Sequence, residues 1–402
     1  MAAVIAGLPA GRRLRIAMFT DYFFPELGGI QDSIATLGRA LGERGHQVDI
    51  LAPRYGRADY ARIGVGPGER DLGANVRVHR RASLPFPSST RQSRAAMISP
   101  FARLPFQAGV LPDVVHVHSF FGVGLEALIM AGGRIPVIGT QHTTIAGFAG
   151  HMPVSVAAAS SYARWFYNRC DRITAPSRSV FDELGDGLRP PCSVLSNPID
   201  TTLFAPVSGA ARAALRAEFG FTGPVVVHAG RLGAEKNIPA VLHGVARLAG
   251  DACLVLAGHG AQEAELRALA GRLGIAGRVR FVGTLPQAGL ARLLAASDVF
   301  AIMSTSETQS MVLLQAMACG LPVVAANSRA LPEFVAPETG LLVPPGDAAA
   351  LAAALDALLA DVGRRSRMGA AARVAAAAYR IDAVTDAWEG LYAAMLDRRI
   401  AA

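Results

Sequence analysis

Of the 39 lysines and arginines in this sequence, only Lys236 is a lysine. It lies with Arg231 in the segment 230–237, directly after an apolar run at 225–229 that predicts a strand. A planar guanidinium and a mobile ammonium at the end of a strand could together hold a diphosphate. A solvated surface turn is the alternative interpretation of these residues.

A polar segment, 304–310, follows a second predicted strand at 299–303. The next residues, 311–318, predict a short helix, with Ser310 as its N-cap and Gly320 just past its end. The first N–H groups of a helix have no partner within it, so they can bind a phosphate.

This predicted helix start brings polar groups to the end of the second strand. The carboxylate of Glu307 could accept hydrogen bonds from sugar hydroxyls, and the amides near Ser310 and Met311 could bind a phosphate. Gln315 lies further along the same helix. The alternative for Glu307 is a solvated loop acid or a helix cap.

Two glycines, Gly28 and Gly29, follow the first predicted strand, 15–20, and open the first predicted helix. Residues without side chains let a phosphate or a sugar approach the backbone amides. A pair of glycines is a weak signal, because ordinary turns contain the same residues. The sequence has no GxGxxG motif and no P-loop motif, which argues against dinucleotide-binding and P-loop proteins.

The elements that must position these residues follow an alternating pattern. Short apolar runs alternate with helical periodicity in both halves of the chain, as in parallel sheets with crossover helices. The predicted strands are 15–20, 47–51, 76–79, 114–118, 136–140, 172–175 and 193–195 in the first half and 225–229, 252–257, 279–282, 299–303, 322–325 and 341–343 in the second.

Turn-forming residues near 197–222 separate the two halves. We therefore predict two doubly wound α/β domains, 1–200 and 201–380, followed by a helix at 381–402 that packs back toward the first domain. Ligands of such sheets bind beyond the carboxyl ends of the strands, so the site is expected in a cleft between the domains.

Three histidines lie in predicted strands of the first domain or directly after one. His142 follows the strand 136–140 and would point into the cleft, with a core histidine as the alternative. His116 and His118 alternate along the strand 114–118 and so share one face. No carboxylate stands near them at ligand spacing, so we expect packing or lining of the cleft rather than a metal site.

Composition limits the class of protein. Hydrophobic residues make up 51% and charged residues 17% of the 402 residues, which excludes a disordered or fibrous chain. Charged residues, glycine or proline interrupt the apolar stretches, so we expect no membrane-spanning helix. The N-terminal apolar run precedes its arginines, unlike a signal peptide, and we predict a cytoplasmic protein, with the inner face of the membrane as an alternative location.

The net charge of +8 implies attraction to an anionic partner. No nucleic-acid motif accompanies the charge, so we expect no nucleic-acid partner and favour a phosphorylated small molecule or an acidic membrane surface. The segment 77–103 interleaves arginines with apolar residues and could face anionic lipid headgroups. A solvated connection between strands is the alternative.

Three groups of residues, 24–29, 230–236 and 306–325, resemble the retaining glycosyltransferases of family 4, also called group 1. The resemblance spans nearly the whole chain. Residues 112–118 and 141–143 are most similar to the branch that glycosylates diacylglycerol and related lipids. It implies the GT-B fold, in which two Rossmann-like domains face each other across a cleft.

The same resemblance implies roles for the residues singled out above. Arg231 and Lys236 would hold the donor diphosphate, and Glu307 would meet hydroxyls of the transferred sugar. The loop of Gly28 and Gly29 would lie near the phosphates and the acceptor. His142 would contact the transferred sugar.

Gln315 departs from the family pattern. A second glutamate usually stands at this position, where it is implied to meet the nucleotide ribose. Glutamine keeps a carbonyl acceptor and gains donors, but it loses the charge. We expect a tolerated change with weaker nucleotide binding, and early loss of catalysis is the alternative.

We therefore predict a hexosyltransferase that moves a hexose, with retention, from a nucleoside diphosphate sugar to a hydroxyl of a lipid or glycan acceptor. The family resemblance favours UDP as the nucleotide of the donor, with GDP as the alternative. No cofactor is expected, and no metal, because no carboxylate pair of the type that binds a diphosphate–metal complex is apparent. A UDP-N-acetylhexosamine 2-epimerase and a catalytically degenerate scaffold protein are the rival predictions.

Overall fold

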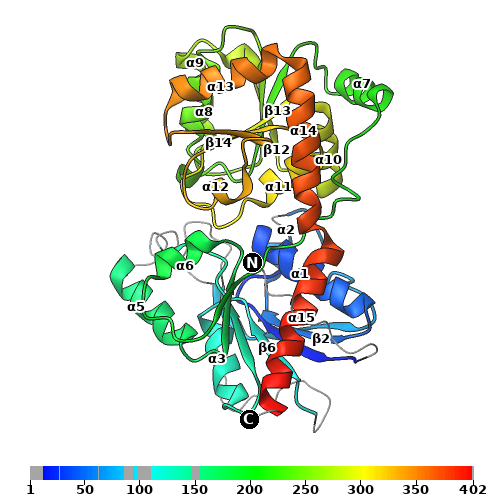
Figure 1. The fold of residues 1–402 in the computed structure, drawn as a ribbon, viewed down its shortest axis with the longest axis vertical. Helices are drawn as coiled ribbons and strands as arrows, with labels where there is room; N and C mark the ends of the chain where they lie inside the picture. The colour runs from blue at the N-terminus through cyan, green and yellow to red at the C-terminus, as the bar shows by residue number, and fades with distance from the viewer. Residues whose placement is uncertain are drawn as a thin grey trace. The chain divides into compact units, whose positions relative to one another are not determined.

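The computed structural model of the chain describes residues 12–26, 28–61, 63–85, 94–96, 110–145 and 154–400. The chain divides into two compact units (Figure 1). The first contains the chain up to Pro198 together with helix α15 (Ile381–Ile400), and the second runs from Ile199 to Arg380. The chain therefore leaves the first unit and returns to it with its last helix.

The first unit is built on a parallel sheet of seven strands in the order β3-β2-β1-β6-β7-β8-β9. These strands are β1 (Arg15–Phe19), β2 (Gln47–Pro53), β3 (Val76–Arg81), β6 (Val114–Val117), β7 (Val137–Thr140), β8 (Arg172–Ala175) and β9 (Cys192–Val194). The described helices before α15 are α1 (Gly29–Glu43), α2 (Arg57–Ala61), α3 (Gly122–Ala131), α5 (Val156–Tyr167) and α6 (Arg178–Leu184). Two short strands, β4 (Ser83–Pro85) and β5 (Arg94–Ala96), form a separate antiparallel pair.

The second unit is built on a parallel sheet of six strands in the order β12-β11-β10-β13-β14-β15. These strands are β10 (Val225–Ala229), β11 (Cys253–Ala257), β12 (Val279–Gly283), β13 (Val299–Ile302), β14 (Val323–Ala326) and β15 (Gly340–Val343). Its helices are α7 (Gly209–Glu218), α8 (Ile238–Val245), α9 (Glu263–Arg272), α10 (Gln287–Ala296), α11 (Met311–Ala318), α12 (Leu331–Phe334), α13 (Ala348–Ala360) and α14 (Val362–Ala376). Short 3-10 turns are η1 (Ala234–Lys236), η2 (Ala276–Arg278) and η3 (Ala377–Tyr379).

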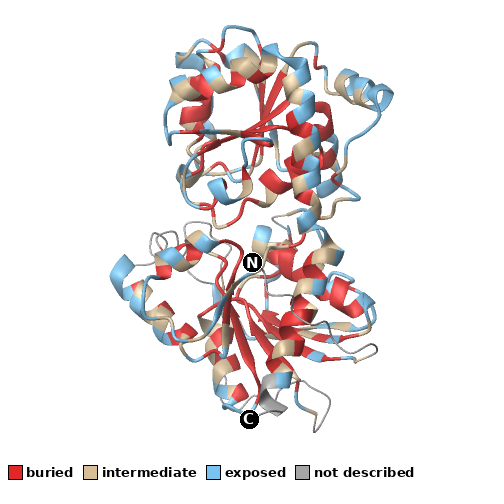
Figure 2. Cartoon of the chain, viewed as in Figure 1, coloured by how far each residue is buried: buried red, intermediate tan, exposed pale blue. Residues whose placement is uncertain are grey.

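The two sheets confirm the predicted doubly wound α/β architecture. Each predicted strand forms within a residue or two of its expected bounds. Figure 2 shows that the central strands of both units are buried, and every residue of β6, β10 and β13 is buried. A parallel sheet has both faces covered by its crossover helices, which is why these strands are almost entirely apolar, with His116 and His228 as the exceptions.

Helix α1 shows how the sequence pattern sets the packing of a crossover helix. Its Ile34, Leu37 and Leu41 lie on one face and are buried in the same core cluster as Met18 of β1. Gly45 follows the helix with a φ of 90°, the left-handed conformation in which glycine ends helices. None of the helices in the described ranges is both long enough and apolar enough to cross a membrane.

Helix α15, which follows the second unit in the sequence, packs in the core of the first unit. Its Trp388 and Tyr392 are buried in the same cluster of side chains as Ile34 of α1. Arg44, just past α1, pairs with Glu389 of α15 at an N–O distance of 2.6 Å. The last helix therefore completes the first unit.

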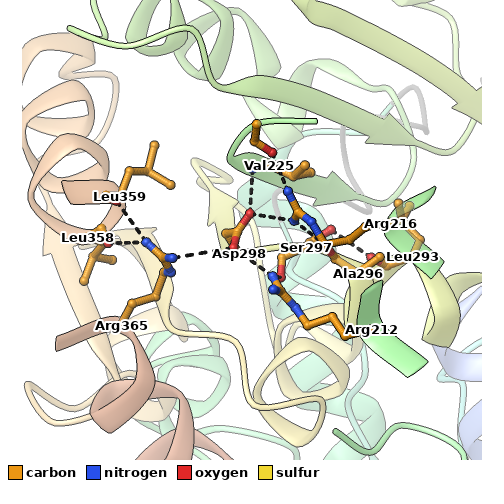
Figure 3. A network of polar contacts seen from close by, with 11 residues as sticks. Arg212, Arg216, Val225, Leu293, Ala296, Ser297, Asp298, Leu358, Leu359 and Arg365 are labelled. Carbon is orange, nitrogen blue, oxygen red and sulfur yellow. Dashed lines mark hydrogen bonds and ion pairs between the residues drawn. The ribbon is translucent and has the colours of Figure 1, made fainter. Parts of the chain in front are cut away.

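In the second unit, one buried carboxylate ties the start of two strands to two helices (Figure 3). Asp298 directly precedes β13 and accepts a hydrogen bond from the amide of Val225 in β10 at 2.8 Å. It also pairs with Arg212 and Arg216 of α7 at 2.8 and 3.0 Å, and with Arg365 of α14 at 3.7 Å. Asp298 is only 7% exposed, so these contacts hold a charge inside the protein.

Three of the described arginines of the basic segment 77–103 make ion pairs with acidic side chains. The pairs are Arg80–Glu69, Arg81–Glu126 and Arg94–Asp59. Residues 86–93 and 97–103 of the segment lie outside the described residues. Contact of this segment with anionic lipid headgroups stays a prediction.

Candidate active site

The carboxyl ends of β10 and β13 lie side by side, because these two strands pair directly in the second sheet. After β10 the chain turns at Gly230, whose φ of 143° favours glycine. The turn passes so close to Gly258 that any side chain there would clash with the carbonyl oxygen of Gly230. The two glycines therefore let residues 231–236 lie against the edge of the sheet.

Lys236 and Glu307 meet at this edge. The Nζ of Lys236, at the end of η1, lies 2.6 Å from Oε1 of Glu307, in the loop after β13. The side chains are 21% and 8% exposed, so the ion pair is largely withdrawn from water. The structure thus brings together two residues that the sequence predicts separately, 71 positions apart.

The charge of Glu307 is stabilised in spite of its burial. Burial alone would raise its pKa, but the charge and hydrogen bond of Lys236 lower it, with further lowering by the neighbouring Ser304 and His228, and the net shift of the pKa is downward. An ammonium has three N–H donors. Lys236 can therefore bind Glu307 and still donate hydrogen bonds to a ligand.

The lowered pKa of Glu307 predicts how the stability of the protein depends on pH. Ionised Glu307 stabilises the fold above its ordinary pKa of 4.5, and this contribution is lost as the pH falls through the lower pKa of the folded state. The difference in free energy of unfolding between the wild type and Glu307→Gln should therefore shrink as the pH falls from about 7 to about 3. Urea unfolding at several pH values measures this difference, and a difference that does not change with pH would contradict the ion pair.

Arg231 also stands at the edge of the second sheet, where its Nη2 lies 2.8 Å from Oε1 of Glu235. The Arg231 side chain is 46% exposed, and a surface pair of this kind is weak enough to open for a ligand. The carbonyl oxygen of Glu235 accepts hydrogen bonds from Ser304 Oγ at 3.0 Å and from the Thr305 amide at 3.1 Å. These bonds, which the sequence did not predict, join the loops after β10 and β13.

His228 is a second unpredicted residue of this edge. It lies in β10, and its Nδ1 donates a hydrogen bond to the carbonyl of Ala301 in β13 at 2.9 Å. Burial lowers the pKa of His228 to about 4, and the charge of Lys236 acts in the same direction. The neutral ring adds no repelling charge beneath the ammonium. The sequence feature that could have identified this residue is a histidine within an otherwise apolar predicted strand.

Helix α11 begins at the same edge, and its start confirms the predicted N-cap. The hydroxyl of Ser310 accepts a hydrogen bond from the amide of Leu313 at 3.3 Å, and Met311 is the first helical residue. Gln315 is buried in the helix, and its Nε2 donates to Oε1 of Gln287 in α10 at 3.2 Å. The amide that replaces the family's glutamate therefore has a specific partner.

In the first unit, Gly28 and Gly29 open α1 as predicted. Gly28 is the N-cap and has no side chain to cap the helix, and both glycines are exposed. A side chain on Gly28 would come within 2.7 Å of Oε1 of Gln31. The amides of this helix start are thus accessible to a ligand.

His142 follows β7 and lines a small pocket of the first unit together with His118. The other lining groups include the aromatic rings of Tyr22, Phe120 and Phe121 and the polar side chains of Ser119, Gln141 and Thr143. The Nε2 of His142 lies 2.9 Å from Nδ1 of His118. Burial lowers the pKa of His142 to about 4, so the ring is neutral at pH 7.

His116 and His118 pack inside the first unit. His116 bonds to the hydroxyls of Tyr392 and Thr140, and His118 bonds to His142. Across the described ranges of the chain, no group of three or more His, Cys, Asp or Glu side chains is arranged to hold a metal ion. The contacts of His116 agree with packing, whereas His118 also lines the pocket, and both outcomes fall within the prediction of packing or lining.

Asp21 is a buried acid beside the pocket that the sequence analysis did not single out. It follows β1, and its carboxylate accepts hydrogen bonds from Ser119 Oγ at 2.7 Å and from the Val123 amide of α3 at 3.1 Å. Burial raises the pKa of Asp21 to about 6, although both hydrogen bonds act to lower it. Asp21 thus fixes Ser119, which forms part of the pocket wall. The sequence feature that could have identified Asp21 is an acidic residue directly after a predicted buried strand.

Both units match sequence models of glycosyltransferases. The model of glycosyltransferase family 4 matches residues 27–203, and that of the glycosyl transferases group 1 matches residues 212–375. A GDP-mannose-dependent alpha-mannosyltransferase of Mycolicibacterium smegmatis is 33% identical over 396 residues, which cover 96% of this chain and 99% of that protein. The chain belongs to the group 1, family 4 glycosyltransferases.

Two further comparisons place this glycosyltransferase among its relatives. An alpha-monoglucosyldiacylglycerol synthase of Streptococcus pneumoniae is 28% identical, over 78% of this chain and 71% of that protein. The structure of Anabaena Alr3699/HepE in complex with UDP and glucose superposes with a TM-score of 0.73 at 21% identity, over 94% of this chain and 98% of that one. The two-domain GT-B fold predicted for this glycosyltransferase is thereby confirmed. The matches favour a glycosyltransferase over the rival 2-epimerase.

Proposed function

We propose that this glycosyltransferase moves a hexose from a nucleoside diphosphate sugar to a hydroxyl of a lipid or glycan, with retention, in the cytoplasm or at the inner face of the membrane. The observation that carries the proposal is the pair of Lys236 and Glu307 at the carboxyl edge of the second sheet. Ammonium donors beside a carboxylate acceptor suit the two parts of such a donor, its diphosphate and its sugar hydroxyls.

The proposed chemistry uses these residues on the leaving group. The bond from the anomeric carbon to the diphosphate oxygen breaks, and a bond from that carbon to the acceptor oxygen forms. Negative charge grows on the departing diphosphate, so Lys236 and Arg231, once Arg231 has left Glu235, stabilise the transition state more than the ground state. The acceptor proton passes to an oxygen of the departing phosphate on the same face of the sugar. This route needs no protein nucleophile.

GDP-mannose is the first donor to test. The M. smegmatis relative, similar over nearly the whole chain, is GDP-mannose-dependent by name, which supports GDP over the UDP that family habit favours. The fold neighbour in complex with UDP and glucose supports UDP-glucose as the second donor. The diacylglycerol synthase among the relatives supports a lipid acceptor alongside a glycan.

Radiolabelled donors test the proposal. Purified protein is incubated with labelled GDP-mannose or UDP-glucose and with either a total lipid extract or soluble glycans. We expect one donor to label one of the two acceptor classes. Binding of a nucleotide without any labelled product would favour the scaffold alternative, and absence of both binding and transfer would contradict the proposal.

The substitution Gln315→Glu tests whether the unusual glutamine is tolerated. A carboxylate hydrogen-bonds a ribose hydroxyl about twice as strongly as an amide does, so we expect nucleotide to bind about 2- to 10-fold more tightly to the variant. The amide of Gln287 would turn to donate to the new carboxylate. Calorimetry and turnover of both proteins measure the effect. Turnover by the variant alone would show that the native chain has lost catalysis.

A further inference from the structure

Both cations at the carboxyl edge of the second sheet are paired with a carboxylate of the protein itself. Lys236 pairs with Glu307 in the loop after β13. Arg231 directs Nε and Nη2 at one oxygen of Glu235, Oε1, at distances of 3.1 and 2.8 Å. Two positive and two negative side chains therefore stand at this edge. Together they carry no net charge, so a diphosphate must compete with protein carboxylates for both cations.

The two ion pairs differ in how far they are withdrawn from water. The Glu307 side chain is 8% exposed, whereas the Glu235 side chain is 30% exposed and that of Arg231 is 46% exposed. An exposed pair of long side chains contributes little to stability and opens readily, but separating a buried pair is costly. The pair of Arg231 and Glu235 is therefore the one that a ligand can open.

The backbone of Glu235 is held in place, so its side chain can move without the loop. The carbonyl oxygen of Glu235 accepts hydrogen bonds from Ser304 Oγ at 3.0 Å and from the Thr305 amide at 3.1 Å. These bonds connect the turn η1 to the loop after β13 and do not involve the Glu235 carboxylate. Rotation of the Glu235 side chain away from Arg231 therefore leaves them intact.

Gly233 provides the space in which the Glu235 carboxylate lies. A Cβ atom at position 233 would overlap both carboxylate oxygens of Glu235. The backbone at Gly233 is extended, with φ −119° and ψ 163°, a conformation that any residue adopts. The backbone conformation therefore does not require glycine at this position. The absence of a side chain is what lets Glu235 lie against Arg231.

A carboxylate in this place opposes the binding of a diphosphate in two ways. It occupies the Nε–Nη2 edge of Arg231, with which a guanidinium can hold an oxyanion through two parallel hydrogen bonds. Its negative charge also repels the negative charge of the phosphates. When a diphosphate leaves, the return of Glu235 gives Arg231 an anionic partner again. The carboxylate therefore favours the empty site over the occupied one.

We propose that Glu235 competes with the diphosphate for Arg231, leaving the guanidinium when the donor binds and returning to it as the product nucleoside diphosphate departs. Glu235 thereby weakens nucleotide binding and speeds release of the product. This role rests on the proposed function, because it requires that Arg231 binds the donor diphosphate. It adds to that site an acidic residue that regulates its occupancy.

Two variants remove the competing carboxylate in different ways. Glu235→Gln removes its charge and keeps its shape, whereas Gly233→Ala keeps the charge and fills the space that the carboxylate occupies. Calorimetry with GDP and with UDP compares both variants with the wild type. We expect each variant to bind the diphosphate about 3- to 10-fold more tightly, with a smaller gain for GMP or UMP. Tighter binding separates this role from a structural one, because damage to the fold weakens binding.

Stopped-flow dissociation of the bound diphosphate measures the effect on product release. Affinity changes among variants of one site arise mostly in the dissociation rate. We therefore expect the diphosphate to leave Glu235→Gln about 3- to 10-fold more slowly than the wild type. An unchanged dissociation rate would contradict a role of Glu235 in release.

Two controls isolate the competition for Arg231. Glu218→Gln removes the same charge from an exposed carboxylate of the second unit that also pairs with an arginine, Arg292, and it should leave the Kd unchanged. In the Arg231→Ala background, Glu235→Gln should gain less affinity than in the wild type, since the two residues act on the ligand together. Equal gains in both backgrounds would overturn competition for Arg231.

The failure of this role and the failure of the proposed function give different results. A wild type that binds GDP or UDP, with equal or weaker binding by Glu235→Gln, would overturn the proposal, and weaker binding would show that Glu235 orients Arg231 for the ligand instead. If neither nucleotide binds to the wild type or to either variant, the diphosphate site itself is contradicted, and the role of Glu235 with it.

Discussion

Replacing Lys236 with alanine is expected to remove most of the preference of this glycosyltransferase for a nucleoside diphosphate over a monophosphate. A hydrogen bond to a charged group contributes about 1.5–3 kcal/mol, which is a factor of about 10 to 150 in Kd. The loss in kcat should reach about 10²- to 10³-fold, because charge grows on the leaving diphosphate in the transition state. Calorimetry with GDP and GMP measures the first effect, and donor consumption measures the second.

Two further variants serve as controls. One controls for the loss of a positive charge, and the other for the buried Glu307 that is left without its partner. Arg247→Ala removes a charge from an exposed position of the same unit and should leave both measurements unchanged. Lys236→Ala also leaves Glu307 buried without its ammonium, so the double variant Lys236→Ala/Glu307→Gln should regain stability but not diphosphate affinity. Equal affinity of wild type and Lys236→Ala for GDP would contradict the assignment of the diphosphate site.

Replacing Asp298 with alanine is expected to destabilise the second unit by about 3–5 kcal/mol, as when one partner of a buried ion pair is removed. The substitution leaves Arg212, Arg216 and Arg365 facing one another without the carboxylate that they share (Figure 3). It also removes the acceptor of the Val225 amide at the start of β10. Urea unfolding of the full chain measures the loss.

The exposed Asp251 of the same unit provides the matched control. Asp251→Ala should change the free energy of unfolding by less than about 0.5 kcal/mol, as surface substitutions usually do. Asp298 precedes β13, at the opposite end of the strand from Glu307. Nucleotide affinity of the Asp298→Ala variant, measured where the protein is still folded, should therefore equal that of the wild type. A stability loss no larger than that of the control would show that the network does not hold the unit together.

The sequence predicted the strands and caps well, because these depend on local residue patterns. Apart from His228, the runs 225–229 and 299–303 are apolar, as is typical of strands covered on both faces. The capping hydrogen bond of Ser310 could be predicted as well, because a serine directly before an apolar helix is a local pattern. The carboxyl ends of parallel strands lie at one edge of a sheet. Arg231, Lys236 and Glu307 of the second unit could therefore also be assigned to that edge.

Contacts between distant segments could not be predicted in this way. The strand order decides which strand ends are neighbours, so the bond between Lys236 and Glu307 appears only once β10 is seen beside β13. The same holds for His118 and His142, which follow the neighbouring strands β6 and β7. The network of Asp298 joins α7 and α14, which lie near opposite ends of the second unit's sequence. No spacing of residues in the sequence predicts this contact.

One measurement tests the central claim most directly: 1H NMR of the anomeric protons during the reaction of GDP-mannose with the acceptor class that becomes labelled. We predict that the donor signal decays only when acceptor is present and that the product shows the same anomeric configuration as the donor. A product of inverted configuration would contradict the retaining mechanism in which Lys236 and Arg231 stabilise the departing diphosphate. A donor that stays unchanged with every acceptor, and likewise with UDP-glucose, would contradict hexosyl transfer itself.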